Sequence, residues 1–183
     1  MRFFFISISI FFFLITKVYS DVSKKIINNL EKANNYSFKF IQQINQNKET
    51  GYCILVFNRK INCEYDNSGK ILVSDGKNLI VKVKNSNIPS FYKLENTTFY
   101  SILDKQYLIN QIIKNNVRNE YGELFTNLNY QDTDIKVFFD QEKLHIKGWK
   151  TTDIYNNSVL TEITIKDVNK IINENIFDLE KFN

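Results

Sequence analysis

Apolar and polar residues alternate with a period of two over much of this chain, and that alternation predicts β-strands. Tyr36, Phe38 and Phe40 share one face of a long first strand reaching towards Gln46, because neighbouring side chains on a strand point to opposite faces. Comparable runs predict further strands at 52–57, 61–65, 91–94, 135–139, 144–149 and 159–165. With the hairpin described below, we expect eight to ten strands.

Two stretches follow a helical period instead. Val22, Ile26, Ile27 and Leu30 recur at three- and four-residue spacing, which predicts an amphipathic helix that Asp21 or Ser23 can cap and that ends near Asn34. A second helix is expected from Phe99 to about Ile113.

The clearest local signal is a β-hairpin at residues 70–83. Two β-branched apolar runs flank Asp75-Gly76, a pair that accepts the positive φ angles of a tight turn. Apolar runs on both sides predict that this hairpin lies in the middle of an antiparallel meander. Pro89 is the only proline and falls in the loop that follows, where its missing amide harms no strand pairing.

Residues 1–20 have the pattern of a cleaved signal peptide. Arg2 precedes an apolar run from Phe3 to Ile15, and Val18-Tyr19-Ser20 is a cleavage site of small-residue type. The alternative is a membrane anchor, but the run is shorter than the roughly 18–20 residues that a span needs. We therefore expect an exported domain at 21–183, forming one unit without internal boundaries. It should be unlipidated, because the residue after the expected cut is Asp21 and not Cys.

Charge argues against nucleic acid as a partner. The 24 basic and 20 acidic residues give a net charge of +4, which falls to +2 when Arg2 and Lys17 are removed with the signal peptide. Charges of both signs are interspersed, and no basic run is long enough to follow a phosphate backbone.

Cys53 and Cys63 would be exported to an oxidising compartment. If residues 58–60 form a hairpin turn, the two cysteines face each other and can form a disulfide. The alternative is a pair of small apolar core thiols. A zinc site is not expected, because His145 is the only histidine.

Catalytic patterns are lacking. The chain has no Gly-x-Ser-x-Gly elbow, glycine-rich phosphate loop or Cys-x-x-Cys pair, and His145 is expected on an outer strand face. We expect a protein that is not an enzyme and that uses no metal or cofactor.

Two segments resemble the LolA family of periplasmic lipoprotein carriers: "YSFKFIQQ", which contains Phe38, Phe40 and Gln42, and "LVSDGKNL" in the hairpin. The resemblance implies an α+β fold, in which a strongly curved, unclosed, barrel-like antiparallel sheet has helices covering its concave face. It also implies that apolar side chains line a cavity for acyl chains, whereas the residues alone favour an ordinary solid core.

By position, the resemblance assigns residues to that cavity and its lid. The cavity and lid set is Ile26, Ile27, Leu30, Tyr36, Phe38, Phe40, Ile61, Leu79, Val81, Ile102 and Leu103. The family's Arg-Pro at the end of the strand led by Gly51 is absent, and Arg59 comes two residues late. Either Arg59 reaches the lid from the turn as a latch, or apolar contact alone holds the lid.

The function that the resemblance implies is a monomeric periplasmic chaperone. It would shield the acyl chains of lipoproteins, receive them from an inner-membrane ABC transporter and deliver them to the outer membrane or a lipoprotein receptor there. The alternatives are a lipid- or lipoprotein-binding receptor or sensor of the same fold, an envelope enzyme with an unrecognised site, and a structural β-domain with a solid core.

Overall fold

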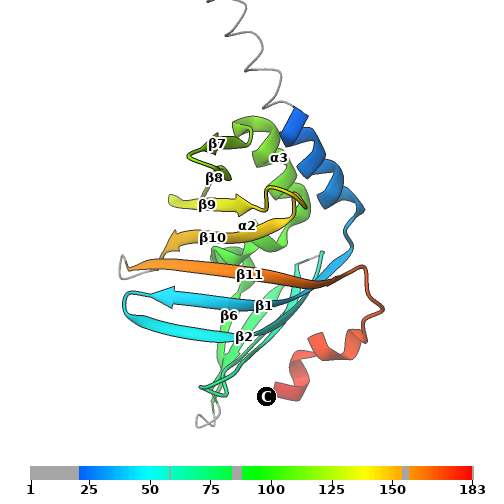
Figure 1. Ribbon diagram of the computed structural model, residues 1–183. Helices are drawn as coiled ribbons and strands as arrows, with labels where there is room; N and C mark the ends of the chain where they lie inside the picture. The colour runs from blue at the N-terminus through cyan, green and yellow to red at the C-terminus, as the bar shows by residue number, and fades with distance from the viewer. Residues whose placement is uncertain (1–20, 58, 84–87, 154–156, 183) are drawn as a thin grey trace, which may run out of the picture.

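The computed structural model describes residues 21–57, 59–83, 88–153 and 157–182, so the expected signal peptide lies outside the described residues. Within these ranges, eleven strands form one antiparallel sheet that does not close into a barrel (Figure 1). Its spatial order is β6-β5-β4-β3-β2-β1-β11-β10-β9-β8-β7. The strands are β1 (Asn35–Ile44), β2 (Asn47–Val56), β3 (Lys60–Tyr65), β4 (Ile71–Asp75), β5 (Asn78–Lys82), β6 (Ser90–Lys93), β7 (Arg118–Glu120), β8 (Glu123–Tyr130), β9 (Thr133–Phe139), β10 (Ile146–Thr152) and β11 (Ser158–Val168).

Helices cover one face of this curved sheet. The first helix occupies residues 21–32 of the described chain, and α2 (Phe99–Leu103) and α3 (Lys105–Asn115) follow β6. The described residues also contain three short 3-10 helices. η1 (Leu94–Asn96) lies between β6 and α2, and η2 (Glu174–Phe177) and η3 (Leu179–Phe182) follow β11. The expected α+β class, with an open curved sheet and helices on its concave face, is confirmed.

β1 is the central strand of the sheet. It pairs with β2 along its whole length and with β11 from Tyr36 to Ile44. Phe40 lies opposite Gly51, and a Cβ at residue 51 would collide with the Phe40 ring and with the carbonyl oxygen of Glu64. Glycine is therefore required there, because it leaves room for the aromatic ring on the concave face.

The sequence predictions for the helices needed two corrections. The expected single helix from Phe99 to Ile113 is broken at Asp104, which has an extended backbone and accepts the Tyr107 amide at 2.9 Å as the cap of α3. Ser23 lies inside the first helix and does not cap it. Its hydroxyl instead accepts the backbone N–H of Val117 at 2.9 Å.

The strand predictions missed β7 and β8. This segment contains Tyr121 and Gly122 at a turn with positive φ angles, and polar residues alternate with Leu124 and Leu128 on β8. Residues 118–130 carry no strong turn dipeptide, so the local pattern was weak. β8 pairs with β9 and β7 pairs with β8, so the sheet has eleven strands and not the expected eight to ten.

The two faces of the sheet carry separate apolar clusters. The main core joins the concave side chains of nearly every strand to the inner faces of the first helix, α2 and α3. On the opposite face Val73 and Ile80 are 0% and 1% exposed, where η2 and η3 pack against β3, β4 and β5. The C-terminal segment therefore covers the outer face of the meander, and Asn62 donates to the carbonyl of Ile176 at 2.7 Å there.

Candidate functional site

A cavity of about 210 Å³ lies between the concave face of the sheet and α2. Its apolar lining consists of Ile44, Phe99, Ile102, Ile135, Trp149 and Val159, and its polar lining of Gln42, Thr98, Thr151, Thr152 and Asp153. These residues come from β1, β9, β10 and β11 and from the start of α2. Among the polar residues, Gln42 is held by a hydrogen bond, in which its side-chain amide donates to the Thr161 hydroxyl at 3.1 Å.

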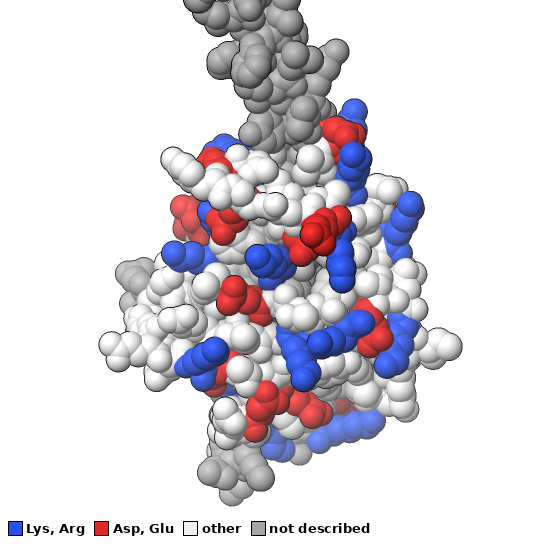
Figure 2. Space-filling model, viewed as in Figure 1, with Lys and Arg blue, Asp and Glu red and all other residues white. Residues whose placement is uncertain are grey.

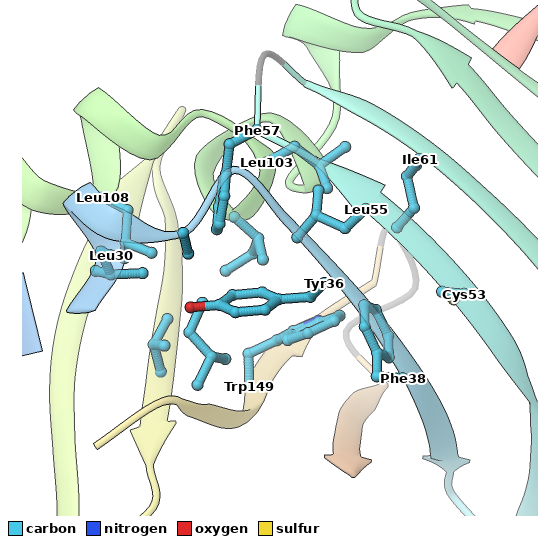
Figure 3. Close-up of a cluster of buried hydrophobic side chains, with 14 of the residues drawn as sticks. Leu30, Tyr36, Phe38, Cys53, Leu55, Phe57, Ile61, Leu103, Leu108 and Trp149 are labelled. Carbon is cyan, nitrogen blue, oxygen red and sulfur yellow. The ribbon is translucent and has the colours of Figure 1, made fainter. Parts of the chain in front are cut away.

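The rest of the concave face is filled by the protein's own side chains. Tyr36 is fully buried at its centre, with its ring edge-on to Phe57 at 5.3 Å between centroids. Figure 3 shows Tyr36 pointing into the cluster, with Phe57, Leu103 and Trp149 arranged around it. An acyl chain longer than the cavity would therefore need space that is now occupied by side chains.

The eleven residues assigned to the cavity from the sequence are all described, and they occupy two environments. Ile102 lines the 210 Å³ cavity, and the other ten do not. Ile27 and Val81 are half-buried against the core, and the remaining eight are buried within it: Ile26, Leu30, Tyr36, Phe38, Phe40, Ile61, Leu79 and Leu103. The structure brings these residues together as one packed layer between the helices and the sheet.

Several cavity residues were not found from the sequence. Ile44 continues the face of Tyr36, Phe38 and Phe40 by strict alternation, and this signal was available. Trp149 and Ile135 lay in predicted strands, but nothing local indicated that β9 and β10 would lie next to α2.

Arg59 connects the turn after β2 to α2. Its guanidinium donates to the Tyr100 hydroxyl at 3.3 Å, lies 5.4 Å from the Tyr100 ring centroid and is 3.9 Å from a carboxylate oxygen of Asp104. Arg59 therefore reaches the second helical segment from the turn, which is the first of the two alternatives left open by the sequence. The expected role as a latch stays a prediction.

Three tyrosines hold the other side of α2. Tyr100 stacks on Tyr130 with 5.3 Å between ring centroids, and Tyr107 packs edge-on against Tyr130 at 5.5 Å. The Tyr130 hydroxyl donates to the carbonyl of Glu95 at 2.6 Å, next to the start of α2. α2 is thus fixed between the β2–β3 turn and the end of β8.

The two cysteines form a disulfide between β2 and β3. Cys53 and Cys63 lie directly opposite each other, with 4.1 Å between their Cα atoms, and both are buried. The sequence left open a disulfide or two apolar core thiols, and the structure has the disulfide.

His145 is not on an open strand face as expected. It precedes β10, is half-buried, and its Nδ1 lies 3.4 Å from the Tyr36 hydroxyl. Burial lowers the pKa of His145, Asp140 opposes this shift, and the positive charge of Lys143 adds to it. Burial also raises the pKa of Tyr36 to about 12, so this pair is neutral at pH 7.

The described residues offer neither a metal site nor a membrane-spanning helix. They contain no group of three or more His, Cys, Asp or Glu side chains arranged to hold a metal ion. None of their helices combines the length and the apolar character needed to span a bilayer.

Comparison with known proteins gives matches at the level of structure. No family model and no curated protein matches the chain. A putative outer membrane lipoprotein-sorting protein domain from Vibrio parahaemolyticus superimposes with a TM-score of 0.51 at 9% identity, covering 88% of this chain and 96% of that one. A DUF1329 family protein from Desulfovibrio piger gives 0.51 at 6% identity, with 91% and 98% covered.

The chain shares the fold of the lipoprotein-sorting domain. A LolA superfamily protein from Nitrosomonas europaea also matches, with a TM-score of 0.47 at 8% identity, covering 86% of this chain and 96% of that chain. The open, curved antiparallel sheet with helices on one face, which the resemblance implies, is shared with the lipoprotein-sorting domain. In this chain the sheet and α2 border a small, mainly apolar cavity.

Proposed function

We propose that this protein carries acylated lipoproteins across the periplasm, from an inner-membrane ABC transporter to the outer membrane or a receptor there. The observation that carries the proposal is the apolar cavity under α2 on the concave face of a LolA-like sheet. The lipoprotein-sorting domain of similar fold supports the choice of cargo. The apolar residues of the cavity suit hydrocarbon, which needs exclusion of water and little directional chemistry.

The size of the cavity determines how cargo would bind. A cavity of about 150 Å³ holds one benzene molecule, whereas pockets for whole drug-sized ligands measure about 300–1,000 Å³. At about 210 Å³ the cavity accepts one end of an acyl chain. The remainder of the chain would enter by displacing α2 and separating it from the sheet.

The energies favour such a displacement. Lifting α2 exposes Ile102 and Leu103, now 3% and 1% exposed, at a cost of about 1.5–3 kcal/mol each. Breaking the Arg59–Asp104 pair adds about 1 kcal/mol or less, because both side chains are partly exposed. Loss of the Tyr100–Tyr130 stack and of the Arg59–Tyr100 hydrogen bond adds about 0.5–1.5 kcal/mol each. A long acyl chain gains on the order of 10 kcal/mol from burial, at about 0.8 kcal/mol per methylene, which meets or exceeds the sum of these costs.

The local structure of α2 is consistent with a moving lid. The helix has five residues, its N-cap Thr98 makes no side-chain capping bond, and Asp104 separates it from α3 with an extended backbone. Helices this short gain little stability from their own hydrogen bonds. We infer that α2 moves as a unit about Asp104.

The test is native mass spectrometry of the protein purified from its own envelope, together with extraction of lipoprotein from membrane vesicles. We expect bound acylated protein and release of lipoprotein into the soluble fraction. A protein that arrives without cargo and extracts none would refute the carrier function. Bound lipid without acylated protein would favour the receptor or sensor alternative.

We further propose that the activity involves no catalytic step. The Tyr36–His145 pair is the arrangement closest to an acid-base pair, and it lies outside the cavity under α2. Screening for hydrolase activity with and without His145→Ala tests this. Activity that disappears in His145→Ala would establish an enzyme instead.

A further inference from the structure

The sheet splits between β10 and β11. These strands pair from Gly148–Glu162 to Thr152–Ser158, whereas β11 continues to pair with β1 as far as Val168. Within the described residues, no pairing joins the start of β10 to the second half of β11. In Figure 1 the two ribbons separate on the right of the view.

Gly148 is the physical cause of this split. Its φ is +157°, the β9–β10 register shifts between Ile146 and Gly148, and a Cβ at residue 148 would collide with the carbonyl oxygen of Thr161. A bulge at this position bends β10 away from its neighbour. The result is a wedge-shaped opening, which we call the β10–β11 wedge.

The β10–β11 wedge holds a pocket of about 420 Å³. Its apolar lining is Ile146, Ile163, Ile165 and Val168, and its polar lining is Asp140, Lys143, His145, Lys147, Thr164 and Lys166. Ile146 belongs to the main core, and Ile163 and Ile165 pack against it. The wedge therefore leads from the solvent to apolar side chains that adjoin the core.

The charge of the wedge is positive. Lys143, Lys147 and Lys166 are exposed, and none of them forms an ion pair with a carboxylate of the described residues. Asp140 is the one carboxylate in the lining, and it accepts the backbone amides of Glu142 and Lys143. Figure 2 shows charges of both signs mixed over one face of the molecule.

We propose that the β10–β11 wedge binds an anionic amphiphile, a molecule with one alkyl chain and a carboxylate or phosphate head. The alkyl chain lies on Ile163, Ile165 and Val168, and the head group lies among Lys143, Lys147 and Lys166. The pocket volume falls within the range of about 300–1,000 Å³ typical of small-molecule sites. Ammonium groups on flexible stems act as point charges and accept either type of anion. The proposal is independent of the carrier function, because its residues are separate from those under α2.

The test is calorimetric titration of the purified protein with three probes at concentrations below micelle formation: oleate, an oleoyl lysophosphatidylglycerol and oleyl alcohol. We expect both anionic probes to bind at least tenfold more tightly than the alcohol, and added salt to reduce this difference. The tighter of the two anionic probes identifies a carboxylate or a phosphate head as the preferred one. Equal affinity for the alcohol would overturn the proposal.

Two variants locate the site. Lys147→Glu combined with Lys166→Glu should weaken anion binding about tenfold, because two of the three positive charges proposed to face the head group become negative. Lys48→Glu combined with Lys114→Glu makes the same charge change at exposed positions on β2 and α3 and should leave the affinity unchanged. Equal effects of the two double variants would show a nonspecific charge effect and would refute the site.

A third variant separates the wedge from the cavity. Val159→Trp fills the cavity under α2 and should leave oleate affinity unchanged if oleate binds in the wedge. Loss of oleate binding in Val159→Trp, with no change in the wedge lysine variant, would place the ligand under α2 and overturn the proposal. Failure of lipoprotein extraction alone would refute the carrier function and leave the wedge intact.

Discussion

The guanidinium of Arg59 donates a hydrogen bond to the Tyr100 hydroxyl at 3.3 Å, which joins the β2–β3 turn to the middle of α2. Arg59 has a φ of +71°, so it occupies the left-handed region of the backbone within this turn. The same tyrosine stacks on Tyr130. Tyr100 therefore links the two sides of the sheet across the concave face.

Replacing Arg59 with alanine should loosen α2 with little loss of global stability. The Arg59 and Asp104 side chains are 40% and 20% exposed, so the free energy of unfolding should fall by about 1 kcal/mol or less. Uptake of an apolar dye such as 1-N-phenylnaphthylamine should become faster, because the lid opens more often. Stopped-flow fluorescence measures the rate.

Lys136→Ala is the matched control for Arg59→Ala. It removes an ion pair with Glu123 at 2.8 Å and a contact with the Phe125 ring, both away from α2. Dye uptake should stay at the wild-type rate in this variant. An unchanged rate in Arg59→Ala would show that apolar contacts alone hold the lid.

Filling the cavity should abolish cargo binding while the fold is retained. Val159 is 8% exposed and lines the cavity, so Val159→Trp places a ring in the space of about 210 Å³. Lipoprotein extraction from vesicles should fall at least tenfold, while the circular dichroism spectrum remains native. Val83→Trp adds the same ring at a position that is 41% exposed and should extract normally. Normal extraction by Val159→Trp would exclude this cavity as the acyl site.

The disulfide should stabilise the pairing of β2 and β3. Cys53 and Cys63 are ten residues apart, and closing a loop of this length contributes roughly 3 kcal/mol by restricting the unfolded chain. Dithiothreitol should therefore lower the urea midpoint of the wild-type protein. The double variant Cys53→Ala with Cys63→Ala should already have the lower midpoint and should not respond to the reductant. A reductant effect of equal size in both proteins would contradict this assignment.

Stability should decrease on mild acidification because of His145. Burial lowers its pKa in the folded state, so the unfolded chain binds the proton more readily. The stability that neutral His145 contributes is complete above the ordinary histidine pKa of about 6.5. It is lost as the pH falls from there through the lowered pKa that His145 has in the folded protein. The groups that act on His145 are Asp140, which raises its pKa, and Lys143, which lowers it.

Urea unfolding at pH 7.5 and pH 5 measures this effect, and His145→Gln should remove most of the difference. Hydrogen bonds hold the pKa values of Asp140 and Asp167 below the ordinary value, so these carboxylates affect stability at lower pH. Between pH 7.5 and pH 5 both carboxylates are above their pKa in the folded and the unfolded state, so they contribute little to this comparison. A His145→Gln variant with the same loss of stability between pH 7.5 and pH 5 would show that another group is responsible.

The alternation of apolar residues determined most of the strands and the faces they bury. Tyr36, Phe38 and Phe40 lie on one face of β1, and the expected hairpin joins β4 to β5. Its turn is one residue later than predicted, because Asp75 ends β4 and only Gly76 of the Asp-Gly pair has a positive φ. These features depend on residues that are neighbours in the sequence, so local propensity decides them. The break at Asp104 was missed because the apolar spacing continues through it, although the aspartate also caps the helix that follows.

The tertiary structure alone decided which apolar residues line a cavity and which fill the core. Leu30 and Ile102 have the same pattern in the sequence, yet Leu30 packs within the core and Ile102 borders the cavity. The wedge depends likewise on Gly148 bending β10 away from β11, two strands whose separation no local pattern encodes. Empty volume arises where distant elements fail to fill the space between them, so it depends on their relative placement and cannot be deduced from any single segment.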